Sequence, residues 1–210
     1  MARILYLILC FWIHSVSAQR CVEIKLDNDS LEEEYTIETL RFYLSQLQFH
    51  QADGDWISEK NSFHLIDLEE PNSWKIQLPK EIRKTKIDSI SFLIGIDSST
   101  NVAGILEGDL DPIKGMYWAW NSGYINFKVE GEKRSTKSKF EYHLGGYLPP
   151  YATARKIDFV RDPKSKKITV RLNLKQFLDQ IDMGKLNEVM ISGPDAVDLS
   201  NKLPTCFSLE

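Results

Sequence analysis

Two histidines and a short run of soft side chains are the residues of this sequence best suited to bind a metal. His64 and His143 each lie in a predicted strand, and Met116 precedes Trp118 and Trp120 in the segment MYWAW. Neutral imidazoles and thioethers suit copper. If the two imidazoles meet across the fold, they form a mononuclear site. A single histidine in a strand is otherwise a structural residue.

The MYWAW segment has two further interpretations. The two-residue period of a strand places Trp118 and Trp120 on one face, where they would pack as core aromatics. Exposed together with Tyr117, they would instead form a flat aromatic platform for a carbohydrate ring. In the loop before them, Glu107 and Asp109 alternate with other residues up to Asp111. We favour a turn over a Ca²⁺ site there, because the spacing lacks the EF-hand pattern.

The sequence predicts no catalytic activity. It contains no GxSxG, HExxH, GxxxxGK[ST] or CxxC motif and no GxGxxG after a strand. No nucleophile and base pair can be assembled from local motifs. We therefore expect a binding protein rather than an enzyme.

The first eighteen residues predict a secretory signal peptide. Arg3 precedes an apolar run from Ile4 to Ile13, and Val16 and Ala18 occupy the −3 and −1 positions of a cleavage site. The run is too short to span a bilayer, so we expect no membrane insertion after cleavage. The mature chain, residues 19–210, is expected in the periplasm or another extracytoplasmic compartment.

Export changes the interpretation of the cysteines. Cleavage removes Cys10 and leaves Cys21 and Cys206 near the two ends of the mature chain. An even pair in an oxidising compartment favours a disulfide. The alternative is two unrelated buried residues.

Composition indicates an ordinary globular protein. The 210 residues are 42% apolar and 27% charged, with a formal net charge of -4 and a mean hydropathy of -0.30. A chain without a basic excess lacks the electrostatic footprint of a nucleic-acid-binding protein.

Short alternating segments separated by turn residues predict the elements that must position these side chains. They indicate an all-β protein, an antiparallel β-sandwich in a single domain with one or two short helices. The expected strands cover 21–26, 40–49, 56–58, 63–68, 74–78, 87–96, 123–130, 140–144, 154–160 and 168–174, and the expected helices cover 176–181 and 195–203. Residues 97–111 are expected to form a long loop.

Several motifs occur in an order that resembles a known family. They are LIDLEEPNSW (65–74), FLIGIDSSTNVAG (92–104), GDLDPIKGMYWAWNSGYINFKVEG (108–131), FEYHLGGY (140–147) and SGPDAVDLSN (192–201). Together they resemble the MbnP-like domain family, exported bacterial proteins named for a periplasmic partner of the copper chelator methanobactin.

The resemblance implies a β-sandwich with a mononuclear copper site and a di-haem peroxidase-type partner. Characterised relatives use two histidines and, in some members, a tryptophan oxidised to kynurenine. His143 matches the histidine of the family's HLG segment, and Trp118 and Trp120 match its aromatic segment. His64 is the second candidate imidazole.

The chain also departs from the family pattern. Relatives with a kynurenine ligand place a histidine two residues after the modified tryptophan. Here Trp-x-His occurs only as Trp12-Ile13-His14, inside the predicted signal peptide. Ser192 stands in a region where some relatives carry histidine.

We therefore expect an exported copper-binding protein for storage, delivery or scavenging, with His143, His64 and Met116 as ligands and Trp118 and Trp120 beside them. The alternatives are a non-catalytic binding module with an aromatic platform, or a structural sandwich that has lost its metal site.

Overall fold

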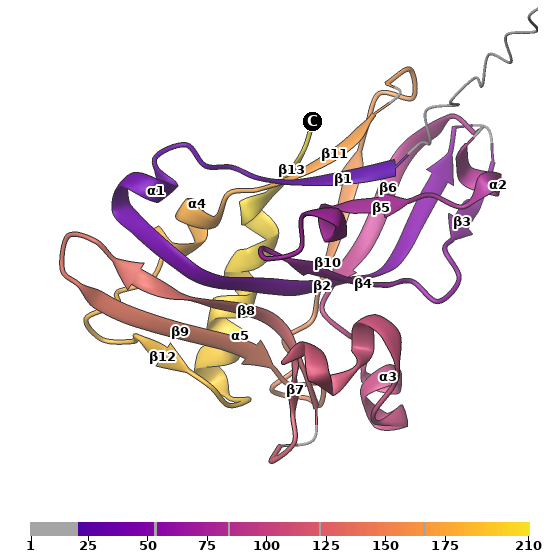
Figure 1. Cartoon of the computed structure of the whole chain (residues 1–210). Helices are drawn as coiled ribbons and strands as arrows, with labels where there is room; N and C mark the ends of the chain where they lie inside the picture. Colours follow the sequence, from indigo (N-terminus) through magenta and orange to yellow (C-terminus); the bar gives the residue numbers. More distant parts are fainter. Residues whose placement is uncertain (1–20, 53, 84, 122, 166) are drawn as a thin grey trace, which may run out of the picture.

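The structure, a computed structural model, describes residues 21–52, 54–83, 85–121, 123–165 and 167–210. The predicted signal peptide lies outside the described residues. Two β-sheets pack face to face, as predicted, and Figure 1 shows the smaller sheet above the larger one. Most strand pairs are antiparallel, but β1 with β11 and β12 with β9 are parallel.

The smaller sheet joins strands from both ends of the chain. Its order is β13 (Phe207–Leu209), β11 (Ile168–Leu172), β1 (Cys21–Leu26) and β5 (Lys75–Gln77). Val22 and Ile24 are buried, and Cys21, Glu23 and Lys25 on either side of them are half-buried. This alternation is the pattern that predicted the strand.

The larger sheet is organised by one long strand, β2 (Tyr35–Gln51). The sheet order is β10 (Arg155–Val160), β6 (Ile87–Ile94), β2, β8 (Gly123–Lys133), β9 (Ser138–Gly145) and β12 (Glu188–Val189). Three short strands pair beside this path: β3 (Trp56–Ser58) and β4 (Phe63–Asp67) with β2, and β7 (Tyr117–Trp118) with β8.

The partner of β2 changes halfway along one edge. Strand β4 occupies one edge of β2 from Arg41 to Ser45. Strand β8 therefore pairs along the other edge up to Phe42, and β6 continues there from Leu44. Strands β8 and β6 therefore diverge from each other between Phe42 and Leu44 of β2.

Two hydrophobic cores lie on opposite faces of the larger sheet. The main core fills the space between the sheets and includes Phe42, Phe127 and Val170. The smaller core lies on the outer face, beneath residues 96–118, and includes Tyr43, Met116, Trp118, Tyr124 and Ile125.

A β-bulge alters the predicted alternation of residues 123–130. Ile125, Phe127 and Val129 were expected on one face, and Phe127 and Val129 do face the main core. The register shifts between Ile125 and Phe127, so Ile125 belongs to the smaller core instead. A bulge places an extra residue in one strand and ends strict alternation.

The helices are short and more numerous than predicted. Helices α4 (Leu174–Asp179) and α5 (Pro194–Lys202) match the two expected ones and contribute Phe177 and Leu199 to the main core. The remaining helices are α1 (Leu31–Glu34), α2 (Lys80–Arg83), α3 (Ser98–Ala103) and the 3-10 turns η1 (Pro71–Trp74), η2 (Gly108–Leu110), η3 (Pro112–Lys114) and η4 (Leu203–Cys206). In the described part of the chain, no helix is long and apolar enough to cross a membrane.

Helix α3 lies in the predicted long loop. The Asp97 side chain accepts a hydrogen bond from the Thr100 amide, at 2.9 Å, and caps the helix. Six residues are too few to display helical periodicity, so only the capping residue indicated this helix in the sequence.

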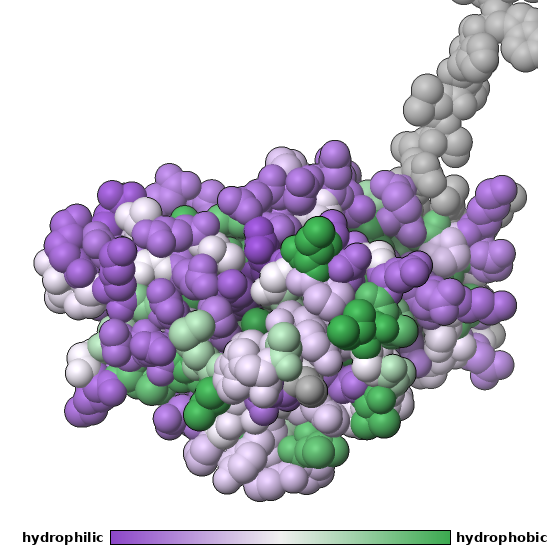
Figure 2. Space-filling model, turned by 60° about the horizontal axis from the view of Figure 1, so that its bottom comes forward, coloured by the Kyte–Doolittle hydropathy of each residue, from purple (hydrophilic) through white to green (hydrophobic). Residues whose placement is uncertain are grey.

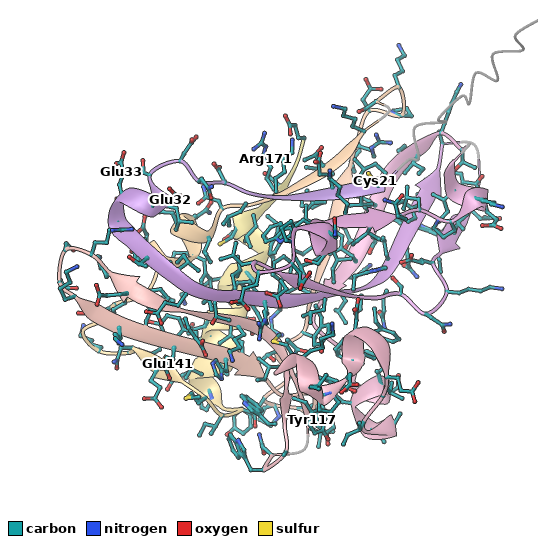
Figure 3. All side chains as sticks on the ribbon, viewed as in Figure 1. Cys21, Glu32, Glu33, Tyr117, Glu141 and Arg171 are labelled. Carbon is teal, nitrogen blue, oxygen red and sulfur yellow. The ribbon has the colours of Figure 1, made fainter. Side chains whose placement is uncertain are left out.

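The predicted disulfide is not formed: Cys21 and Cys206 are both free. Cys21 begins β1, whereas Cys206 precedes Phe207, which pairs with Leu172 beside Leu26 at the far end of β1. The two cysteines are thus separated by five strand residues, roughly 16 Å, although a disulfide needs Cα atoms within about 7 Å. Figure 3 labels Cys21 and Arg171, the neighbour of Leu172, at separate places along this sheet.

We expect the two thiols to react differently with a maleimide. The folded protein should be labelled at half-buried Cys21 and spared at Cys206, because Cys206 is buried and burial raises the pKa of its thiol. After unfolding without reductant, both cysteines should be labelled, as measured by intact mass with a Cys21→Ser variant as control. If the unfolded chain could be labelled only after a reductant was added, the two cysteines would be joined by a disulfide, contrary to this prediction.

Candidate functional site

Strand register places the two candidate ligand histidines on opposite faces of the larger sheet. His143 of β9 lies opposite Lys128, which lies opposite Arg41 of β2. His64 of β4 lies opposite Leu44 of the same strand. Because Arg41 and Leu44 are three residues apart in a regular stretch, their side chains point to opposite faces. The expected convergence of the two imidazoles therefore does not occur.

His143 is held by a carboxylate on the outer face of the sheet. The residue is 5% exposed, and its Nε2 lies 2.7 Å from Glu130 Oε1. Burial lowers the pKa of His143. Burial would raise the pKa of Glu130, but hydrogen bonds from Thr39, His143 and Lys128 and the charge of Lys128 lower it to about 2. At neutral pH a neutral His143 therefore donates its Nε2–H to an ionised Glu130, which leaves the Nδ1 lone pair for another partner.

His64 and His50 each have a separate acidic partner. His64 Nε2 lies 2.7 Å from Glu59 Oε2, and the Ser62 hydroxyl donates to the same oxygen at 2.7 Å. His50 Nδ1 lies 2.7 Å from Asp88 Oδ1. Among the described residues, no three His, Cys, Asp or Glu side chains are grouped so that they could hold a metal ion.

The soft residues of the MYWAW segment separate into buried and exposed groups. Met116 is fully buried and Trp118 is 5% exposed, whereas Trp120 is 65% exposed. Tyr117 packs edge-on against Tyr124 at a centroid distance of 5.1 Å. The core interpretation of the two tryptophans therefore holds for Trp118, with Met116 buried beside it in the same core, but not for Trp120. Tyr117, Trp118 and Trp120 do not form a flat exposed platform either.

Trp118 extends the smaller core toward His143 on the outer face of the larger sheet. A Cβ atom added to Gly145 would lie 2.6 Å from the Trp118 ring, so the indole rests directly on the Gly145 backbone. His143 lies two residues earlier on the same face of β9. Trp118 also packs against Trp120, with ring centroids 5.5 Å apart.

The acidic run before this segment forms turns. Asp109 Oδ2 accepts a hydrogen bond from the Leu65 amide at 3.1 Å, and Asp111 Oδ1 accepts one from the Ile113 amide at 2.9 Å. These two carboxylates hold backbone amides in place through hydrogen bonds, as the turn interpretation predicts.

A pocket that the sequence did not reveal opens beside Trp118. Its volume is about 250 Å³. The lining is aromatic, small or uncharged: Trp118, Asn121, Gly123, Gly146, Tyr147, Leu148, Pro149, Tyr151 and Ser192. These residues come from three separate stretches of the chain, so no local motif contained the pocket. The GGYLPPY segment, with its glycines, prolines and tyrosines, was the available signal.

Several exposed apolar side chains lie at the end of the molecule that carries α3 and β7. Val102, Ile105, Trp120, Leu148 and Ile191 are each more than half exposed. Figure 2 turns this end toward the viewer and shows apolar residues dispersed among polar ones. The pocket therefore opens on a mixed surface.

Trp118 and Trp120 should differ in their contributions to stability. We expect Trp118→Ala to lower the free energy of unfolding by about 3–5 kcal/mol, because it removes a buried ring from a packed core. Trp120→Ala should cost less than about 1 kcal/mol, since its ring is mostly in water.

Denaturant unfolding measures both values. Equal losses for the two variants would mean that Trp120 is buried in solution as well.

Comparisons with known proteins agree with this architecture. The sequence profile of the family described as MbnP matches residues 14–191. The solved structure of MbnP from Methylosinus trichosporium superposes with a TM-score of 0.55 at 12% sequence identity, covering 90% of this chain and 97% of that chain. At that identity the likeness shows a shared fold. No curated protein sequence matches this chain.

Proposed function

Because the chain belongs to the MbnP family, we propose that it is an exported, non-catalytic copper-handling protein in which His143 offers the imidazole ligand. The observation that supports this proposal most directly is the hydrogen bond between His143 and Glu130. A carboxylate that accepts one ring N–H of a histidine fixes the tautomer and orients the other nitrogen, and this arrangement accompanies most metal-ligating histidines.

The surroundings of His143 favour a soft, singly charged ion. Met116 and Trp118 form part of the neighbouring small core, and a thioether is a ligand that selects Cu(I). The Lys128 ammonium, 3.2 Å from Glu130, repels a divalent ion more than a monovalent one. His64 does not fit the same site, because it lies on the other face of the sheet. The donor set around His143 is thus smaller than the two-histidine set that we expected.

A binding role rather than catalysis agrees with the hydrogen bonds of a cluster that resembles a catalytic set. Ser62 donates to Glu59, and His64 contacts the same carboxylate oxygen. Activation of a serine requires its hydroxyl to donate to the imidazole instead. A di-haem peroxidase-type partner, which the family resemblance implied, belongs to the same proposal.

Export is tested by the mass of the protein recovered from its own cell envelope. We expect a chain that begins at Gln19, because Val16 and Ala18 fit signal peptidase. Intact mass would identify the first residue, and an uncleaved chain confined to the cytoplasm would contradict export.

Copper binding is tested by exchanging one imidazole at a time. We expect His143→Gln to weaken Cu(I) binding by more than about tenfold, measured by competition with a chromogenic chelator. His64→Gln is the matched control, since it also removes an imidazole bound to a glutamate, and should leave the affinity unchanged. Circular dichroism verifies that both variants are folded.

Full-strength Cu(I) binding by folded His143→Gln would overturn the proposed site. A loss of equal size in His64→Gln would show that copper is not bound at His143 alone.

A further inference from the structure

We propose that the pocket beside Trp118 binds a neutral carbohydrate ring. The pocket is separate from the proposed copper ligand, because none of the described residues that line it is a histidine, methionine or cysteine. Its volume of about 250 Å³ lies just below the range for drug-sized ligands, and so it suits one ring rather than an extended chain.

The lining excludes charged ligands. Among the residues that the structure describes, the lining contains no Asp, Glu, Lys, Arg or His side chain. A carboxylate, phosphate or ammonium that entered would lose hydration without gaining an opposite charge, which is strongly unfavourable. The ligand is therefore expected to be uncharged.

Polar groups at the mouth distinguish a sugar from an aromatic compound. Asn121 Nδ2 and Ser192 Oγ face each other at 3.4 Å, a long hydrogen bond that a better partner can replace. An amide and a hydroxyl each both donate and accept, as sugar hydroxyls require. A purely aromatic ligand would cover these groups without offering partners for the hydrogen bonds that they do not make to each other, which is unfavourable.

Aromatic rings supply the complementary apolar surface. Trp118 and the two tyrosines, Tyr147 and Tyr151, line the pocket. Tyrosine and tryptophan combine a large apolar face with a polar group and only two side-chain torsions, so they lose little entropy on binding. The C–H face of a pyranose ring is apolar while its edge carries hydroxyls, which matches a pocket of rings with an amide and a hydroxyl at one side.

The pocket wall is held in place before a ligand arrives. The buried Asn126 side chain donates to Thr153 Oγ1 at 2.8 Å, and the Thr153 amide donates to the Gly146 carbonyl at 3.0 Å. These bonds close the loop that carries Tyr147 and Tyr151. A Cβ atom on Gly146 would lie 2.3 Å from the Tyr151 carbonyl oxygen, so only glycine permits this approach. A preformed wall lowers the entropic cost of binding.

Saturation-transfer NMR with the mature protein tests the proposal. The probes are the methyl glycosides of glucose, galactose and mannose, with indole and benzoate as aromatic and anionic comparators. We expect at least one glycoside to bind while benzoate does not. Ser192→Tyr should abolish binding because the new ring fills the pocket, and Tyr151→Ala should weaken it about tenfold, as expected for the loss of one stacked ring.

Two further variants distinguish specific recognition of the sugar from non-specific binding. Asn121→Leu preserves the size of the side chain but removes its hydrogen bonds, so it should weaken glycoside binding about tenfold. Trp56→Ala is the matched control, because Trp56 is an exposed aromatic residue on β3, outside the pocket lining. It should leave binding unchanged. Thermal unfolding verifies the fold of each variant.

The proposal is overturned if no glycoside binds, if indole binds in place of the sugars, or if Ser192→Tyr binds as well as the unaltered protein. None of these outcomes bears on copper, which is measured separately through His143.

Discussion

The amide of Asn126 joins the parts of the larger sheet that would otherwise separate. Its Oδ1 accepts a hydrogen bond from the Ile96 amide at 2.8 Å, and its Nδ2 donates to Thr153. The Asn126 side chain packs against Gly95 at the point where β2 exchanges β8 for β6. A buried amide with both ends satisfied holds these segments in one arrangement, whereas an apolar residue of the same size would leave the Ile96 amide without a partner. The outer core and the pocket wall both depend on this junction.

The two faces of the larger sheet have different roles because of this arrangement. The inner face packs on the smaller sheet and is almost entirely apolar. The outer face carries a row of charged and polar residues, from Asp67 and Arg41 through Lys128 to His143. Arg41 Nε lies 2.7 Å from Asp67 Oδ2, and Lys128 and His143 each contact Glu130. His143 thus lies at the end of an ionic row and beside an aromatic core, and an imidazole there is both desolvated and oriented.

Much of the fold could be predicted because strands with one buried face alternate visibly. Residues 21–26 and 87–94 show that pattern, and the helix at 194–202 begins at a proline. The candidate site was harder to predict from the sequence, because it depends on the register of the strands. A residue three positions along a strand lies on the other face, so His64 could be assigned only once Leu44 was known as its partner. The disulfide prediction was wrong for a similar reason. The two cysteines lie near the two ends of the mature sequence, but the sequence does not show that the fold places them at opposite ends of β1. The pocket residues come from separate stretches that only the folded chain brings together.

The pairing of β1 with β11 has a consequence for when the protein can fold. Val22 pairs with Ile76 of β5 on one side and with Ile168 of β11 on the other, so the first strand finds its second partner only after most of the polypeptide has been made. Contacts between such distant residues are slow to form. A nascent chain that cannot complete its smaller sheet early stays extended for longer, which is the condition that a narrow secretion channel demands. The topology of the sandwich would thereby assist the export that we propose for this chain.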